Sequence, residues 1–250
     1  MTLSPHASNL PPIITVVGFS DAGKTTLIEK LVPELKQRGY RVGTVKHAAH
    51  GFAVDREGKD SWRHQQAGAD IVAVAGPDKI AMVINTPDDI LATLRRMMTG
   101  VDLMLAEGFK SARLPKLEVL RKVVHANPLF LEDPNLFALV TDIAMPSPDA
   151  NGLAVFGLED IPALADLIVL LGEPLRHPGV YDFESSRLAA RARDAGFDLV
   201  VRKGFMRAPP PETIFLHRKL AGTFLLCVRI GARVDTHALV APHLQGGLVT

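Results

Sequence analysis

The chain has 250 residues, a formal net charge of +1, 47% hydrophobic residues and 22% charged residues. These values are ordinary for globular proteins, and they exclude disordered and fibrous chains. The single cysteine excludes an intramolecular disulfide and a cysteine-based metal cluster. A net charge so close to zero argues against proteins that coat nucleic acid or acidic membranes, so we expect neither as a partner.

The first residues carry no pattern for export. Residues 1–12 lack the basic and apolar regions of a secretory signal, and their Ser, Asn and Pro content predicts a disordered lead-in. No apolar run in the sequence reaches the ~18–20 residues that a membrane span needs. We therefore expect a cytoplasmic protein.

Charge is distributed unevenly along the chain. Residues 1–172 carry a net charge of −3 and residues 173–250 a net charge of +4. The change coincides with Gly172-Glu173-Pro174, and Gly and Pro interrupt both strands and helices. We expect one domain over 13–172 and an accessory module over 173–250.

Short apolar runs alternate with amphipathic stretches in the first part. The expected strands are 13–18, 41–46, 71–75, 79–84, 102–107 and 136–141. The expected helices are 24–38, 60–67 and 87–98. Pro33 can bend the first of them, and Thr86 is the expected N-cap of the last, with Asp89 three residues on. Buried strands separated by helices predict an α/β fold with a mostly parallel central sheet flanked by helices.

The second part has a different pattern. The stretch 184–195 is rich in Arg and Ala and predicts a helix, 197–202 a strand, and 212–231 a long helix with a wide apolar face. Cys227 in that helix is expected to act as a small buried hydrophobic residue. The extension is therefore predicted to be small, mainly helical, and packed on its own core or on the first domain.

Residues 18–25 read GFSDAGKT and match the phosphate-binding pattern G-x-x-x-x-G-K-[ST] between an expected strand and an expected helix. Backbone N–H groups of this loop and the helix N-terminus are expected to bind phosphate oxygens. Lys24 is expected to reach the β- and γ-phosphates, and the Thr25 hydroxyl to ligate Mg²⁺. The alternative is a glycine-rich turn that starts a helix by chance. Motif and context together favour a P-loop NTPase.

A P-loop protein also needs a carboxylate that orders the metal ion. The apolar run 102–107 ends in Glu107 and Gly108. Glu107 would lie at the carboxyl end of a strand, where open α/β sheets bind their ligands. A solvated acid at a strand end is the alternative.

A second polar stretch follows the second expected strand. It contains Lys46, His47, His50, Asp55 and the sequence GKDS over 58–61. This composition suits a loop that becomes ordered around phosphate and metal. A simpler interpretation is that Asp60 caps the helix over 61–67 and that His50 is exposed. His47 and His50 also suggest a metal site, which no nearby cysteine supports.

These segments together resemble the MobB family, the GTP-binding adaptor proteins of molybdopterin-guanine dinucleotide biosynthesis. The resemblance runs over about 12–172 and includes VVGFSDAGKTTLIEKL, VDREGKDSW, VDLMLAEGFK, LPKLEVLR and GLEDIPALADLI. It implies GTP and Mg²⁺ as cofactors, weak GTP hydrolysis and a homodimer. It further implies a partner, a MobA-like guanylyltransferase that joins GMP to the molybdopterin of molybdenum cofactor.

The resemblance also implies roles for single residues. The expected nucleotide site comprises Gly18, Ser20, Asp21, Ala22, Gly23, Lys24, Thr25 and Thr26, with Lys46 and His47 in the second loop. The expected catalytic residues are Lys24, Asp55 and Glu107, and the expected metal ligands are Thr25 and Glu107. Asp142 lies where an acid could select guanine, although no Asn-Lys-x-Asp motif is present. A turn acid at a strand end is the other interpretation of Asp142.

The family pattern ends near Gly172. The tail contains RKGFMRAPPPETIFLHRKLAGTFLLCVRIGARVD, which resembles the C-terminal end of UbiB-type atypical kinase-like proteins without their catalytic motifs. Two other functions stay open. A P-loop metallochaperone GTPase would use His47, His50 and His64, against which the absence of Cys-x-x-Cys counts. A small-molecule kinase would need a lid with paired arginines, and none is evident in the sequence.

Overall fold

The computed structural model describes residues 10–49, 51–85, 89–124, 133, 135–143, 154–177, 179–188, 191, 227, 230–236 and 238–239. They divide into two compact units. The first contains the residues up to His47 together with those from Met98 to Leu244, and the second is built from 48–97. Within the described ranges, no helix is both long and apolar enough to cross a membrane.

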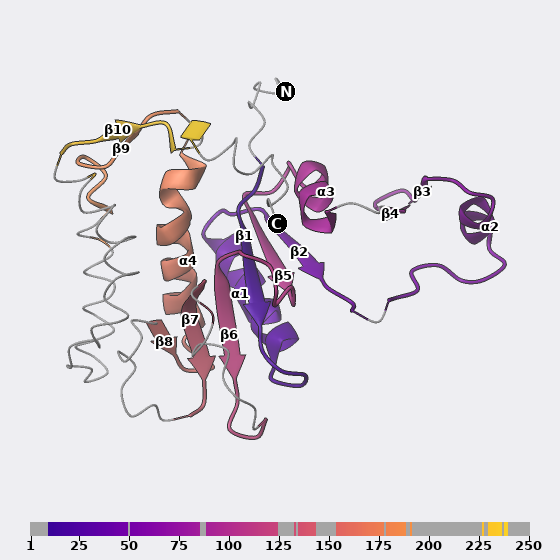
Figure 1. Cartoon of the computed structure of the whole chain (residues 1–250), viewed down its shortest axis with the longest axis horizontal. Helices are drawn as coiled ribbons and strands as arrows, with labels where there is room; N and C mark the ends of the chain where they lie inside the picture. The colour runs from indigo at the N-terminus through magenta and orange to yellow at the C-terminus, as the bar shows by residue number, and fades with distance from the viewer. Residues whose placement is uncertain are drawn as a thin grey trace. The chain divides into compact units, whose positions relative to one another are not determined.

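A six-stranded sheet forms the centre of the first unit (Figure 1). In spatial order its strands are β2 (Val42–Lys46), β5 (Leu103–Glu107), β1 (Ile13–Val17), β6 (Lys116–Leu120), β7 (Leu136–Thr141) and β8 (Ala154–Phe156). Each pair of neighbours is parallel. The carboxyl ends of all six strands therefore meet at one edge, which confirms the predicted parallel α/β sheet and places the P-loop at that edge.

Two strands of this sheet, β6 and β8, are not among the strands predicted from the sequence. β6 reads Lys-Leu-Glu-Val-Leu, and its charged residues argue against a central strand. Both Lys116 and Glu118 are nevertheless buried. Lys116 donates a hydrogen bond of 2.6 Å to Asp133, which compensates its buried charge. β8 has three residues, too few to show a period.

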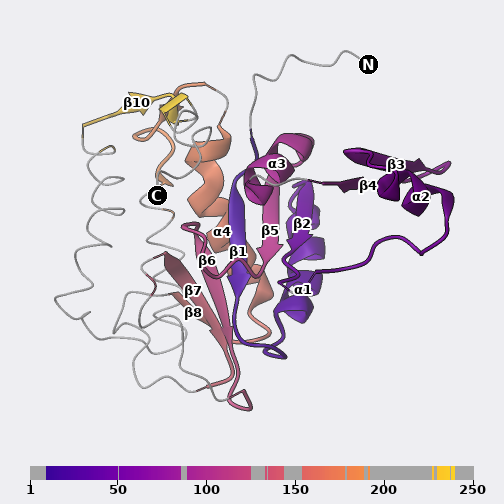
Figure 2. The same ribbon diagram turned by 45° about the vertical axis from the view of Figure 1, so that its right-hand side comes forward.

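Two helices, α1 (Lys24–Gln37) and α4 (Ile161–Arg176), pack against each other and on one face of this sheet (Figure 2). Leu27, Leu31 and Leu35 recur every fourth residue of α1, so one stripe of the helix enters the core. α1 continues through Pro33 as a helix. This packing anchors the first turn of α1 immediately after the P-loop.

The helix α4 was not predicted, and it contains Gly172 and Pro174, where the sequence suggests an interruption. Pro174 lies in the last turn of the helix, which ends two residues later at Arg176, so the interruption affects only the end of α4. Near this end Leu170 joins Tyr181, Phe183 and Leu188 in a second buried cluster. Cys227 packs against that cluster like a small hydrophobic residue, but it is half-buried and not buried as expected.

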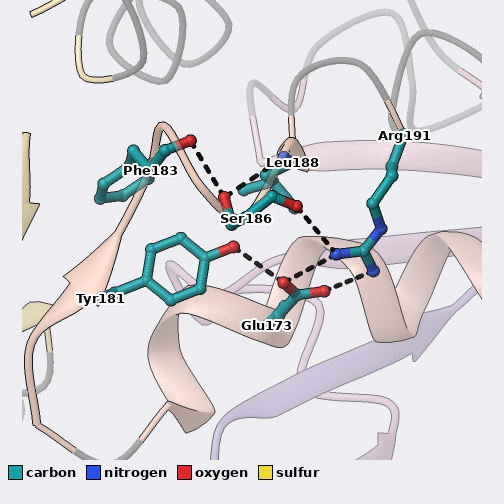
Figure 3. Close-up of polar contacts among 6 residues, drawn as sticks. All are labelled: Glu173, Tyr181, Phe183, Ser186, Leu188 and Arg191. Atoms are coloured by element: carbon teal, nitrogen blue, oxygen red, sulfur yellow. Dashed lines mark hydrogen bonds and ion pairs between the residues drawn. The ribbon is translucent and has the colours of Figure 1, made fainter. Parts of the chain in front are cut away.

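Polar contacts also join the end of α4 to the residues that follow it (Figure 3). Glu173 accepts hydrogen bonds from the Tyr181 hydroxyl, 2.8 Å, and from the Arg191 guanidinium, 2.6 and 2.9 Å. The antiparallel pair β9 (Tyr181–Asp182) and β10 (Arg233–Val234) lies beside them. The described part of the extension is therefore folded onto α4.

The helix expected over 184–195 does not begin at Glu184. The backbone N–H groups of Glu184 and Ser185 donate to the Asp182 carboxylate, which holds a turn at this point. The expected strand 197–202 lies outside the described residues. So does the expected helix 212–231, except for Cys227 and its last two residues.

The second unit contains α2 (Asp60–Gln66), β3 (Ile71–Ala75), β4 (Ile80–Ile84) and α3 (Ile90–Met97). β3 and β4 were predicted as strands of the parallel sheet, and that assignment is wrong. They form an antiparallel pair of their own. The reason is the short connection between them, closed by a hydrogen bond of 2.8 Å from Gly76 N–H to the Lys79 carbonyl, because parallel strands need a long crossover.

The N-terminus of α3 also differs from the prediction. The Asp89 carboxylate accepts hydrogen bonds from the backbone N–H groups of Leu91 and Ala92, at 3.0 and 3.2 Å. Asp89 is therefore the capping residue, and α3 starts at Ile90. Thr86, the expected cap, lies outside the described residues.

Candidate functional site

The P-loop connects β1 to α1 in a conformation that requires glycine. Gly18 has φ +142°, and a Cβ added to it would stand 2.5 Å from the Val119 carbonyl oxygen of the neighbouring strand β6. Gly23, immediately before α1, has φ +94°. The backbone can therefore turn closely around a phosphate group at the N-terminus of α1, as the sequence motif predicts.

Lys24 lies inside this loop. Its Nζ donates a hydrogen bond of 2.6 Å to the Phe19 carbonyl, across the loop. Burial lowers the pKa of Lys24, and nearby Lys110 and Lys46 add to this effect, while Glu107 and Asp21 oppose it. A phosphate oxygen is a stronger acceptor for this ammonium group than a carbonyl, so Lys24 is placed to bind it.

The structure brings the two expected metal ligands together. The Thr25 hydroxyl donates a hydrogen bond of 2.9 Å to Oε2 of Glu107. Glu107 ends β5, in register with Val16 of β1 and Lys46 of β2. Lys46 Nζ lies 3.5 Å from Oε1 of the same carboxylate. One hydroxyl and one carboxylate beside a phosphate loop fit Mg²⁺, which keeps several waters and binds phosphate oxygens.

Groups of three or more His, Cys, Asp or Glu side chains arranged for a metal ion are absent from the part of the chain that the structure describes. His47 instead packs on Phe109, with ring centroids 4.6 Å apart. His64 lies exposed in α2, and His50 lies outside the described residues. The described contacts thus give His47 an aromatic partner beside the end of β5.

The segment after β5 contacts both the end of β2 and the P-loop. The His47 backbone N–H donates 2.9 Å to the Glu107 carbonyl, and a Cβ on Gly108 would stand 3.0 Å from Cβ of His47. Lys110 Nζ lies 4.6 Å from the centre of the Phe19 ring, a cation–π contact with the P-loop. Residues 107–110 therefore link the P-loop to the end of β2.

Asp55 and residues 58–61 belong to the second unit. The Asp55 carboxylate accepts a hydrogen bond of 2.8 Å from the backbone N–H of Arg56. Asp60 is the first residue of α2 and Lys59 occupies the N-cap position, so Asp60 does not cap the helix, although its charge suits a helix N-terminus. The role of Asp55 at the nucleotide stays a prediction.

Asp142 follows β7 at the same sheet edge as the P-loop. Its Oδ2 accepts a hydrogen bond of 2.8 Å from Nε of Arg121, and its Oδ1 one of 2.7 Å from the Lys122 backbone N–H. The hydrogen bond from Lys122 and that from Arg121 lower the pKa of Asp142. Arg121 was missed from the sequence, and the only signal for it is that it ends the run KLEVLR.

Comparison with known proteins agrees with this geometry. Residues 13–142 match the family described as MobB, molybdopterin guanine dinucleotide synthesis protein B. The molybdopterin-guanine dinucleotide biosynthesis adapter protein of Haemophilus influenzae is 37% identical over 166 residues, which make up 64% of this chain and 89% of that protein. A crystal structure of Bacillus subtilis MobB is 32% identical, with a TM-score of 0.52 over 63% of this chain and 96% of that one.

A shorter similarity concerns a different protein. The mitochondrial atypical kinase COQ8B of Rattus norvegicus is 42% identical over 72 residues, which make up 29% of this chain and 13% of that protein. This is consistent with the resemblance of the tail to atypical kinase-like proteins. The matched stretch is a small part of that kinase, so it transfers no kinase activity to this chain.

Proposed function

The chain belongs to the MobB family, and on that premise we propose that it is a GTP-binding adaptor in molybdopterin-guanine dinucleotide biosynthesis. In this proposal it binds GTP with Mg²⁺ in the cytoplasm and assists a separate MobA-like guanylyltransferase, which transfers GMP to molybdopterin. The observation that carries the proposal is the contact between Thr25 and Glu107 at the mouth of the P-loop.

That contact matters because it makes the loop more than a phosphate cradle. Gly18 and Gly23 shape the backbone, and Lys24 supplies a fixed positive charge next to it. Thr25 and Glu107 add the two protein oxygens that a magnesium–nucleotide complex needs. In the proposal, Lys46 and His47 approach the terminal phosphate from the end of β2, and Asp55 takes part in a slow hydrolysis.

A homodimer is part of the proposal, and the hairpin β3–β4 supports it. Every second residue of a strand lies on the same side, and so do two residues that are directly paired in an antiparallel hairpin. By this rule Ile71, Ile80 and Met82 lie on one side of the hairpin. Each is exposed, Ile80 to 70%. Contiguous exposed apolar side chains are typical of protein interfaces. We assign this face to the second copy of the chain.

The test of nucleotide binding is calorimetry of the purified chain with GTP and Mg²⁺. Lys24→Ala is expected to abolish measurable binding, because the phosphates lose the charge inside the loop. Lys36→Ala removes an exposed lysine from the last turn of α1 and is the matched control, with unchanged affinity. Unchanged GTP affinity in the Lys24 variant would overturn the site assignment.

The test of the adaptor role is a reconstituted reaction with a MobA-like guanylyltransferase, molybdopterin and GTP. Addition of the wild-type chain is expected to raise the rate of molybdopterin-guanine dinucleotide formation. The Lys24→Ala variant is expected to leave the rate at its basal value. Equal rates with both proteins would mean that nucleotide binding by this chain is not used in the reaction.

A further inference from the structure

Arg121 lies against the P-loop from the side opposite Glu107. It follows β6, whose Val119 carbonyl is the group that a Cβ on Gly18 would meet at 2.5 Å. Two residues further on, Nη1 of Arg121 lies 3.8 Å from the position that a Cβ on Gly23 would occupy. β6 and β5 are the two neighbours of β1. The phosphate loop is therefore flanked by Glu107 on one side and by a guanidinium on the other.

Asp142 holds this guanidinium in place. Its carboxylate accepts the Nε–H of Arg121 at 2.8 Å and is itself fixed by the Lys122 backbone N–H at 2.7 Å. Arg121 and Asp142 are each about two-thirds buried, with side chains exposed to 33% and 30%. Both carboxylate oxygens of Asp142 thus already accept hydrogen bonds from the chain, on the side of the site away from Glu107.

The two terminal nitrogens of the Arg121 guanidinium, Nη1 and Nη2, are available as hydrogen-bond donors. An arginine carries five N–H donors, of which the contact with Asp142 uses the one on Nε. Within the described part of the chain, Nη1 and Nη2 have no hydrogen-bond acceptor. A planar guanidinium with two free nitrogens matches the geometry of phosphate oxygens, and it lies next to a loop whose N–H groups cradle the α- and β-phosphates of nucleotides.

We propose that Arg121 binds the α- or β-phosphate of the nucleotide from the β6 side of the P-loop, and that Asp142 is a positioning residue that orients the Arg121 guanidinium. This inference rests on the proposed function, because it needs a nucleotide in the P-loop. It gives Asp142 a task other than selecting guanine. The competing explanation is an ion pair that only ties β6 to β7.

The first experiment measures the affinities of the full chain for GTP and for inorganic tripolyphosphate, which has neither base nor ribose. Arg121→Ala is expected to weaken both by about 10- to 100-fold, the effect of losing a hydrogen bond to a charged group. Arg121→Lys keeps the charge without the planar fork and is expected to give an intermediate loss. Lys122→Ala removes the adjacent charge but keeps the backbone N–H, and is expected to change both affinities less than about threefold.

The second experiment is a double-mutant cycle with Asp142→Ala. If Asp142 acts through Arg121, its removal weakens tripolyphosphate binding in the wild type but has little further effect in the Arg121→Ala chain. Thermal unfolding of the same variants reports any loss of structure separately. A role in guanine recognition would instead weaken GTP binding and leave tripolyphosphate binding unchanged, which would overturn the proposal.

The two proposals can fail separately. If the wild type binds GTP and tripolyphosphate and Arg121→Ala binds them equally well, the role of Arg121 is wrong and the nucleotide site stands. If the folded wild type binds neither ligand, the proposed function is wrong, and so is the role of Arg121 that depends on it.

Discussion

The hydroxyl of Thr25 donates a hydrogen bond of 2.9 Å to Glu107, although the two residues are 82 positions apart in the chain. Thr25 is the second residue of α1, and Glu107 is the last residue of β5. The parallel pairing of β1 with β5 brings them together, because it aligns Glu107 with Val16, two residues before the P-loop. The fold itself thus brings together the two oxygen groups that we propose as ligands of Mg²⁺.

This pair predicts how the protein depends on Mg²⁺. Glu107→Gln keeps the size of the side chain but removes the negative charge, so the gain in GTP affinity on adding Mg²⁺ is expected to fall at least about tenfold. Binding measured in EDTA should be nearly unchanged. Calorimetry with GTP, with and without Mg²⁺, measures both quantities.

Asp102→Asn is the matched control for that experiment. Asp102 immediately precedes β5, at the opposite end of the strand from Glu107, where it pairs with Arg41 at 3.0 Å. Its substitution leaves the magnesium effect intact if the effect comes from the site. A Glu107→Gln chain with the full magnesium effect would remove Glu107 from the list of metal ligands.

The P-loop was predictable from sequence because its chemistry is local. The eight residues 18–25 carry the glycines and the lysine expected to bind phosphate and the hydroxyl expected to ligate Mg²⁺, and the apolar run before Glu107 identifies a strand. The parallel order of the strands follows from the alternation with helices. In a parallel sheet the carboxyl ends of the strands meet at one edge. The sequence therefore predicted that Thr25 and Glu107 lie at the same edge of the sheet.

Other features depend on long-range contacts and were missed for that reason. β6 contains two buried charged residues, and the charge of one of them, Lys116, is compensated by Asp133, 17 positions further along the chain. Without that strand, Arg121 has no predicted place beside the P-loop. The pairing of β3 with β4 was misassigned because apolar composition alone does not distinguish an exposed hairpin from a buried strand pair.

The ionisation of Tyr181 gives a prediction on the extension. Burial raises the pKa of Tyr181 to about 12, and its hydrogen bond to Glu173 adds to the rise. Because this folded-state pKa lies above the ordinary value of 10.0, the stabilising contribution is complete below pH 10 and is lost as the pH rises toward 12. The free energy of unfolding of the wild type should therefore fall over this interval more steeply than that of Tyr181→Phe.

Ultraviolet absorbance checks the same group directly. The chain has two tyrosines, so subtracting the titration of Tyr181→Phe from that of the wild type isolates Tyr181. The difference curve is expected to have its midpoint near 12. A midpoint near 10 would mean that burial and the contact with Glu173 do not hold the phenol in its neutral form.

The hairpin face gives a prediction on assembly. Placing charges at its exposed positions, Ile80→Lys with Met82→Lys, is expected to convert a dimer to a monomer in sedimentation velocity, because the apolar interface then contains unpaired charge. Val74→Lys is the control, since Val74 is also exposed but lies on the other side of β3. A dimer that persists in the double variant would show that this face is not the interface.

The backbone at Gly18 gives the sharpest prediction on stability. Gly18→Ala places a methyl group 2.5 Å from the Val119 carbonyl oxygen at φ +142°, so both a steric overlap and an unfavourable conformation oppose it. Loss of about 3 kcal/mol or more in the free energy of unfolding is expected. Gly39→Ala is the control, because Gly39 also has a positive φ, +85°, but nothing within 4 Å of an added Cβ. Its cost should be about 1 kcal/mol. Urea denaturation of the two variants measures both losses in the free energy of unfolding, and their difference gives the cost of the contact with β6. Equal losses would mean that a small movement of the backbone relieves this contact.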